Sequence, residues 1–126
     1  MPSSVKEMLA AANASVPRLK PEDVRGMLGK DDVLIIDVRD PTEVKASGKV
    51  KGAVNVSRGM FEFRADPESP SHNPAFRKEK TIVLYCGSGG RSALSGKTLQ
   101  DLGYNSVYNA GAFKQLAEAG LETEPA

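Results

Sequence analysis

The one cysteine of the chain begins a glycine-rich segment whose residue types suit nucleophilic chemistry. Cys86 is followed by Gly87, Ser88, Gly89, Gly90, Arg91 and Ser92. Three glycines among the four residues between Cys86 and Arg91 allow positive φ angles, so backbone N–H groups can turn toward one point and bind an anion. These amides and the fixed charge of Arg91 favour the thiolate, which is the form of cysteine that attacks.

Two apolar runs and one helical pattern predict where this cysteine loop (residues 86–92) lies. Residues 33–38 (VLIIDV) and 81–85 (TIVLY) are rich in β-branched side chains, which is typical of parallel strands buried on both faces. Residues 92–102 show the apolar spacing of a helix. The loop therefore joins a strand to a helix N-terminus, at the carboxyl edge of a parallel sheet, where ligands bind.

The remaining segments complete an α/β pattern. We expect helices at residues 5–12, 21–28 and 113–119, and short strands at 15–19 and 106–108. Residues 48–56 are expected to form a tight turn that leads into a short strand, and residues 57–74 a long surface connection. Strands that alternate with helices indicate a sheet that is mostly parallel. We further expect residues 1–16 to form an N-terminal helical extension and residues 17–126 to form a single domain.

Composition limits the classes of protein to which the chain can belong. Its 126 residues are 40% hydrophobic and 26% charged, as in an ordinary globular domain. The net charge of +1 gives no support for a nucleic-acid or membrane partner. One Cys and one His exclude an internal disulfide and the Cys-based zinc sites. With no apolar stretch of transmembrane length and a free functional thiol, we expect a cytoplasmic protein.

Three stretches resemble the rhodanese (sulfurtransferase) family in its single-domain form. Residues 36–43 (IDVRDPTE) and 48–55 (GKVKGAVN) are similar to its first two signatures, and residues 85–92 (YCGSGGRS) to its active-site loop. The likeness runs from about residue 19 to residue 121. It implies a three-layer rhodanese-like α/β fold, with a five-stranded parallel sheet and helices on both faces.

The resemblance also implies a chemistry for the cysteine loop. Cys86 accepts a sulfane sulfur from a donor and becomes a persulfide, and the loop amides from Gly87 to Ser92 hold the bound sulfur. Arg91 draws in a small anionic donor such as thiosulfate, although the neutral start of the loop also resembles members that use mercaptopyruvate. A thiol, cyanide or a protein cysteine then removes the sulfur, and the reaction requires no metal or organic cofactor.

This sequence departs from the family pattern at three positions. Lys49 stands where the second signature usually has His, Ala112 replaces a second Gly, and Leu116 falls where Trp is frequent. All three positions are structural in the resemblance, so we expect them to change local packing more than chemistry.

Four residues outside the loop are further candidates for the site. Asp37 ends its strand near the loop, where it could brace backbone N–H groups or form a salt bridge with Arg39; we expect these two residues to give structural support. Arg64 and His72 lie on the long connection and are candidate pocket residues. His72 could donate a proton or bind an anion, and its alternative is a solvated loop position.

Two other function classes remain open. Cysteine phosphatases and arsenate reductases share a Cys–loop–Arg cradle, but they usually have five residues between Cys and Arg, whereas four separate Cys86 from Arg91. A smaller ring fits one sulfur atom better than a tetrahedral oxyanion. The second alternative is a regulatory binding module or a persulfide carrier with a dedicated partner; silent modules commonly lack the Cys that this chain retains.

Overall fold

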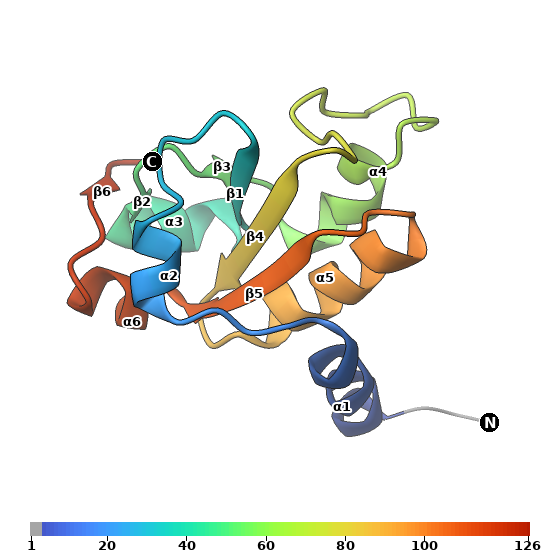
Figure 1. Ribbon diagram of the computed structural model, residues 1–126, viewed down its shortest axis with the longest axis horizontal. Helices are drawn as coiled ribbons and strands as arrows, with labels where there is room; N and C mark the ends of the chain where they lie inside the picture. The colour runs from blue at the N-terminus through green and yellow to red at the C-terminus, as the bar shows by residue number, and fades with distance from the viewer. Residues whose placement is uncertain (1–3) are drawn as a thin grey trace.

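The computed structural model describes residues 4–126 and places a parallel sheet between two layers of helices (Figure 1). The four strands of this sheet run in the order β3-β1-β4-β5, and all neighbouring pairs are parallel. Their bounds are β1 (Val33–Asp37), β3 (Val54–Asn55), β4 (Thr81–Cys86) and β5 (Val107–Ala112). The layered α/β fold expected from the sequence is confirmed.

The expected fifth strand is wrong. Residues 15–19 make a single isolated parallel bridge, between Arg18 and Asn109, at the free edge of β5. Pro17 and Pro21 flank this bridge, and proline has no N–H to donate to a sheet. The pairing therefore stops after one bridge, and the segment runs along β5 as a linker.

Helices and short elements surround the sheet. The helices are α1 (Val5–Ser15), α2 (Pro21–Arg25), α3 (Pro41–Ser47), α4 (Phe61–Ala65), α5 (Gly90–Asp101) and α6 (Phe113–Glu118), with a 3₁₀ turn, η1 (Arg58–Met60). A separate antiparallel pair joins β2 (Lys49–Val50) to β6 (Thr123–Glu124). None of the helices in residues 4–126 has the length and apolarity needed to cross a membrane.

Burial on both faces explains the apolar runs of the two central strands. Alternate side chains of β1 and β4, such as Leu84 and Cys86, share one core cluster with Leu99 of α5. The intervening side chains, such as Tyr85, share the other cluster with Leu116 of α6. Because β4 alternates in this way, Cys86 points to the face that α5 covers.

The predicted connection at residues 57–74 contains regular structure. It forms η1 and α4, and Phe61 is fully buried at a centroid distance of 5.6 Å from Phe76, in an edge-to-face arrangement. Phe63 is 57% exposed, because residues two apart on a helix point in different directions. The proline-rich composition concealed this short helix, which ends before the first of those prolines.

The N-terminal helix α1 packs against α5, close to the residues with which α5 begins. Ala12 is the one buried residue of α1, while Val5 and Met8 are 67% and 48% exposed. A Cβ on Gly90 would lie 3.7 Å from Leu9 Cδ2, so α1 reaches the first residue of α5. Residues 1–3 of the expected extension lie outside the described residues.

Candidate functional site

The loop after β4 brings its amide donors to the sulfur of Cys86. The Gly89 N–H donates to Sγ at 3.0 Å, and the Ser92 hydroxyl lies 3.5 Å from the same atom. Gly89 has a φ of +96°, which the glycine permits, and it caps α5. Cys86 is fully buried whereas Gly87 and Ser88 are exposed, so the sulfur lies at the base of the loop.

Hydrogen bonds shift the ionisation of this thiol. Burial is the largest influence on the pKa of Cys86 and opposes the thiolate. The Ser92 hydroxyl and the backbone N–H groups of Ser92, Ser88 and Gly89 together outweigh burial, and the pKa of Cys86 is lowered below its ordinary value. The loop thus increases the thiolate population near neutral pH, which is what a nucleophilic cysteine needs.

The side chain of Asn109 in β5 holds the cysteine loop in place through hydrogen bonds. It is fully buried, and its Oδ1 accepts hydrogen bonds from Ser92 Oγ at 2.7 Å and from the Gly111 N–H at 2.9 Å. Its Nδ2 donates to the Gly89 carbonyl at 3.1 Å. The sequence analysis missed Asn109; its signal is a polar residue between Val107 and Ala110 in a short buried strand.

Arg91 is committed to a carboxylate of α3. Its two terminal nitrogens donate to Glu43 at 2.6 Å and 3.0 Å, and this bidentate pair ties α5 to α3. The Arg91 hydrogen bonds lower the pKa of Glu43 to about 2, against the opposing effect of burial, and Glu43 raises the pKa of Arg91 in return. A Cβ on Gly87 would lie 3.0 Å from Arg91 Nη2, so the pair also packs against the loop.

Asp37 and Arg39 form a buried ion pair on the other face of the sheet. Arg39 Nη2 lies 2.7 Å from Asp37 Oδ2, and a second nitrogen of Arg39 donates to the same carboxylate. Arg39 also donates to the Gly48 carbonyl at 2.8 Å and stacks over Phe113 at 4.3 Å. These contacts hold the β1–α3 segment to the following turn, and no hydrogen bond within residues 4–126 joins the pair to the sulfur.

The structure does not bring the two candidates from the long connection to Cys86. Arg64 is exposed on α4, and no side-chain hydrogen bond or ion pair of Arg64 occurs within the described chain. His72 is half-buried, and its backbone N–H donates to the Ser69 carbonyl at 3.1 Å. Its Nε2 is buried without a hydrogen-bond partner in the described part of the protein. Within residues 4–126, neither side chain forms a hydrogen bond or ion pair with the cysteine loop.

Of the three departures from the family pattern, Lys49 and Leu116 have structural contacts. Lys49 donates to the Ala53 carbonyl and to Glu124, each at 2.7 Å, which closes the turn after β2 onto β6. Leu116 is fully buried in the core cluster of α6. Ala112 ends β5 next to Gly111, whose φ is +86°.

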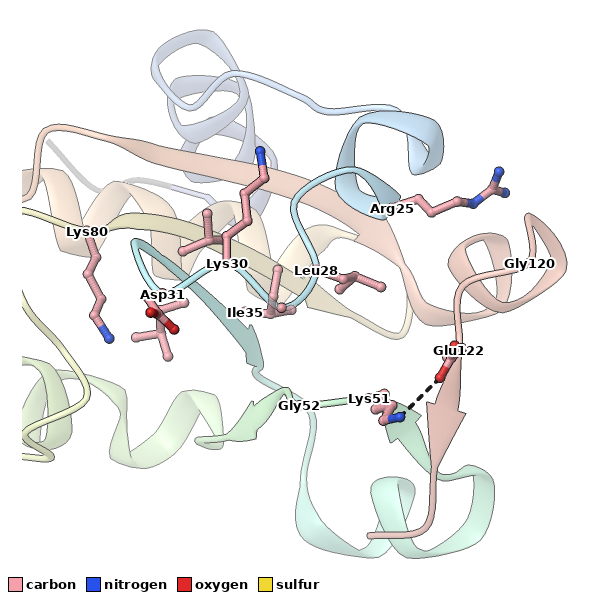
Figure 2. A pocket seen from close by; sticks show the side chains of 13 residues that line it. Arg25, Leu28, Lys30, Asp31, Ile35, Lys51, Gly52, Lys80, Gly120 and Glu122 are labelled. Atoms are coloured by element: carbon pink, nitrogen blue, oxygen red, sulfur yellow. Dashed lines mark hydrogen bonds and ion pairs between the residues drawn. The ribbon is translucent and has the colours of Figure 1, made fainter.

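A cavity of about 750 Å³ lies at the opposite edge of the sheet (Figure 2). Its lining includes Val33, the first residue of β1, and Lys80, which precedes β4, whereas Cys86 is the last residue of β4. Arg25 and Lys30 also line this cavity, which we call the basic cavity, and Lys51 forms an ion pair with Glu122 at one side of it (Figure 2). No nucleophilic cysteine reaches it, and within residues 4–126 no group of His, Cys, Asp or Glu side chains could hold a metal ion.

Comparisons with known proteins agree with this architecture. The sequence profile of the rhodanese-like domain matches residues 20–119. The polysulfide-sulfur transferase homodimer of Wolinella succinogenes is similar in structure, with 35% identity and a TM-score of 0.76, over 96% of this chain and 87% of that one. A Rhodopseudomonas palustris protein, described as of unknown function and a possible tyrosine phosphatase, is 40% identical with a TM-score of 0.88, over 98% and 99% of the two chains.

Curated relatives are longer proteins. The tRNA uridine(34) hydroxylase of Acinetobacter baylyi is 33% identical over 106 residues, which is 82% of this chain and 33% of that protein. A Rickettsia rickettsii protein of the same name matches 72% of this chain and 36% of its own length. The chain therefore spans about a third of the length of these relatives.

Proposed function

Because the chain belongs to the family of rhodanese-like domains, we propose that it is a sulfurtransferase that uses a persulfide on Cys86. The donor is a small anionic sulfur compound such as thiosulfate or a polysulfide, and the acceptor is a thiol, cyanide or a protein cysteine. The observation that supports this most is the cysteine sulfur that accepts the Gly89 N–H at 3.0 Å, within a loop that also lowers its pKa.

The proposed reaction has two displacement steps. The Cys86 thiolate attacks the outer sulfur of thiosulfate, a Cys–S–S bond forms, and sulfite leaves with the electron pair of the broken S–S bond. The acceptor then attacks the outer sulfur of the persulfide, and Cys86 leaves as a thiolate with the bonding pair. Each step balances without an added oxidant, and the inward N–H groups stabilise the anionic sulfur in both.

The first test uses the lone cysteine directly. We expect incubation with thiosulfate to add the mass of one sulfur atom to the folded protein, and cyanide to remove it with thiocyanate as product. Cys86→Ser should abolish both reactions with the fold intact, because a hydroxyl has too high a pKa to ionise and cannot store sulfur. Turnover by a pure Cys86→Ser sample would end the proposal, since no second cysteine is present.

Two alternatives are separated by the same samples. A persulfide that forms but is not released to cyanide or small thiols would indicate a carrier with a dedicated protein partner. The description of the Rhodopseudomonas palustris relative favours testing a phosphatase activity. We expect no hydrolysis of an aryl phosphate, because only four residues separate Cys86 from Arg91 and the resulting ring is small.

The cellular setting is part of the proposal. We place the chain in a reducing compartment such as the cytoplasm, because a lone reactive thiol stays reduced there. The hydroxylase activity in the names of the curated relatives belongs to proteins about three times as long. We propose for this chain the sulfur chemistry of its cysteine loop alone.

A further inference from the structure

The linker between α1 and α2 carries an arginine to the cysteine loop. The Pro17 carbonyl accepts the Asn109 N–H at 2.9 Å, and the Leu19 N–H donates to the Asn109 carbonyl at 3.0 Å. These two bonds fix the backbone of Arg18 beside β5, where Figure 1 shows the linker running along that strand. Arg18 is therefore held in place by its backbone, and its side chain is free to reach across β5.

The guanidinium of Arg18 lies against two glycines, one of them in the loop. A Cβ on Gly111 would lie 3.3 Å from Arg18 Cζ, and a Cβ on Gly89 would lie 3.6 Å from Arg18 Nη1. Gly89 is the residue whose N–H meets the Cys86 sulfur at 3.0 Å. Gly89 therefore lies between the guanidinium of Arg18 and the sulfur of Cys86 and is close to both. The two groups are separated by roughly one Debye length, which is about 8 Å at physiological salt, so the charge of Arg18 is only partly screened at the sulfur.

Arg18 differs from the arginine of the loop itself in having no partner. The two terminal nitrogens of Arg91 both donate to Glu43, and Arg39 forms an ion pair with Asp37. Arg18 is exposed, and within residues 4–126 it forms no ion pair and no side-chain hydrogen bond. Its planar fork of N–H donors is therefore available to an oxyanion from solvent.

We propose that Arg18 binds the charged end of the small anion that reacts at Cys86, and so selects anionic over neutral sulfur compounds. The identification of that anion as a thiosulfate-class donor rests on the proposed function; the position of Arg18 against Gly89 and Gly111 does not. Arg91 then has a different task from the one that the sequence suggested, because it clamps α5 to α3 while Arg18 meets the ligand.

The lone cysteine allows a test that needs no sulfur donor. Iodoacetate and iodoacetamide alkylate the same sulfur but differ by one negative charge. We expect Arg18→Gln to slow alkylation by iodoacetate roughly tenfold, at the lower end of the effect of one charge-assisted contact, while iodoacetamide changes by less than about twofold. Rates measured across pH correct for any change in the thiolate fraction of Cys86. Arg18→Lys should retain most of the preference for iodoacetate.

The matched control is Arg25→Gln. Arg25 is also exposed, and it lies in the basic cavity at the opposite edge of the sheet (Figure 2). We expect this variant to leave both rates unchanged. Equal slowing of the two reagents by Arg18→Gln, or equal effects of the two variants, would overturn the proposal, and so would a folded chain that neither reagent labels.

Thiosulfate separates this proposal from the proposed function. If the parent chain forms a persulfide, Arg18→Gln should raise the KM for thiosulfate by a factor similar to its effect on iodoacetate. If Arg18→Gln slows iodoacetate selectively but the parent chain forms no persulfide, the anion site at Arg18 stands and the sulfurtransferase proposal is refuted. If Arg18→Gln leaves the ratio of the iodoacetate and iodoacetamide rates unchanged while sulfur transfer is normal, the anion site at Arg18 is refuted and the sulfurtransferase proposal stands.

Discussion

Cations are arranged differently at the two ends of the strands of the parallel sheet, which we call its carboxyl edge and its amino edge. At the carboxyl edge, a short loop holds one sulfur against backbone amides, and Arg91 is paired with Glu43. At the amino edge, Arg25, Lys30 and Lys80 line a cavity of about 750 Å³. The cations of this cavity lie at the ends of the strands away from Cys86, so a group of basic side chains does not by itself mark the position of the cysteine.

Direction of the donors explains this difference. Backbone N–H groups at the start of α5 cannot turn away from the sulfur, whereas exposed lysine side chains move and are screened by salt. The pKa of Cys86 is lowered by hydrogen bonds from such groups even though the residue is fully buried. Three perturbations test whether loop geometry, the clamp on the loop or general basicity determines reactivity.

The largest effect is expected from a change in loop size. Insertion of one Gly between Gly89 and Gly90 places five residues between Cys86 and Arg91, and it moves the amides outward from a sulfur-sized centre. Loss of one well-placed donor costs on the order of a hundredfold, so sulfur transfer should fall by that factor while the affinity for arsenate rises. Thiosulfate:cyanide activity and arsenate binding measure the two effects.

The control for this insertion is the fold. Circular dichroism should show the parent secondary structure, because the inserted residue precedes α5 and leaves β4 unchanged. A folded insertion variant that transfers sulfur as well as the parent would show that ring size does not select the reaction. The main reason to prefer sulfur transfer over phosphate chemistry would then be lost.

A smaller effect is expected from the clamp between α3 and α5. Arg91→Ala should slow iodoacetate and iodoacetamide alike, about fivefold, because the half-exposed pair contributes about 1 kcal/mol or less to the position of the loop. This equal loss contrasts with the charge-selective loss expected at Arg18. A loss confined to iodoacetate would instead make Arg91 the cation that binds the anion.

The same clamp predicts a dependence of stability on pH. The pKa of Glu43 is lowered to about 2 in the folded chain, so the pair stabilises the fold above the ordinary pKa of a glutamate and loses this contribution as the pH falls toward 2. Denaturant unfolding should show Glu43→Gln less stable than the parent at pH 7, and the difference should disappear near pH 2. A difference that is constant with pH would contradict the ion pair.

The smallest effect is expected at the amino edge. The double variant Lys30→Gln with Lys80→Gln removes two cations of the basic cavity, and both residues lie at the opposite end of the strands from Cys86. We expect sulfur transfer and both alkylation rates to stay within about twofold of the parent, since the charges are screened over that distance. A large fall in the iodoacetate rate would show that the net field of the protein, and not Arg18, attracts the anion.

Several features were predictable because they depend on neighbours in the sequence. The apolar runs at 33–38 and 81–85 form β1 and β4. The glycine-rich segment after Cys86 forms the loop whose Gly89 N–H donates to the Cys86 sulfur. The helix α4 was not predictable from the same rules, because five residues carry too little periodicity to stand out among prolines. The fifth strand failed for a related reason, since a single bridge depends on the edge of β5 rather than on local preference.

The amino-acid sequence by itself determined the candidate nucleophile, the size of its loop and the strand and helix on either side, because each depends on residues within a few positions of Cys86. The tertiary structure alone decided the contacts between distant segments around the loop. Glu43 and Arg91 are 48 residues apart, Asn109 reaches Ser92 from the next strand, and Arg18 approaches Gly89 from the linker beside β5. Pairing of this kind depends on where the sheet brings distant segments together, and that geometry decides whether an arginine holds the protein or is available to a ligand.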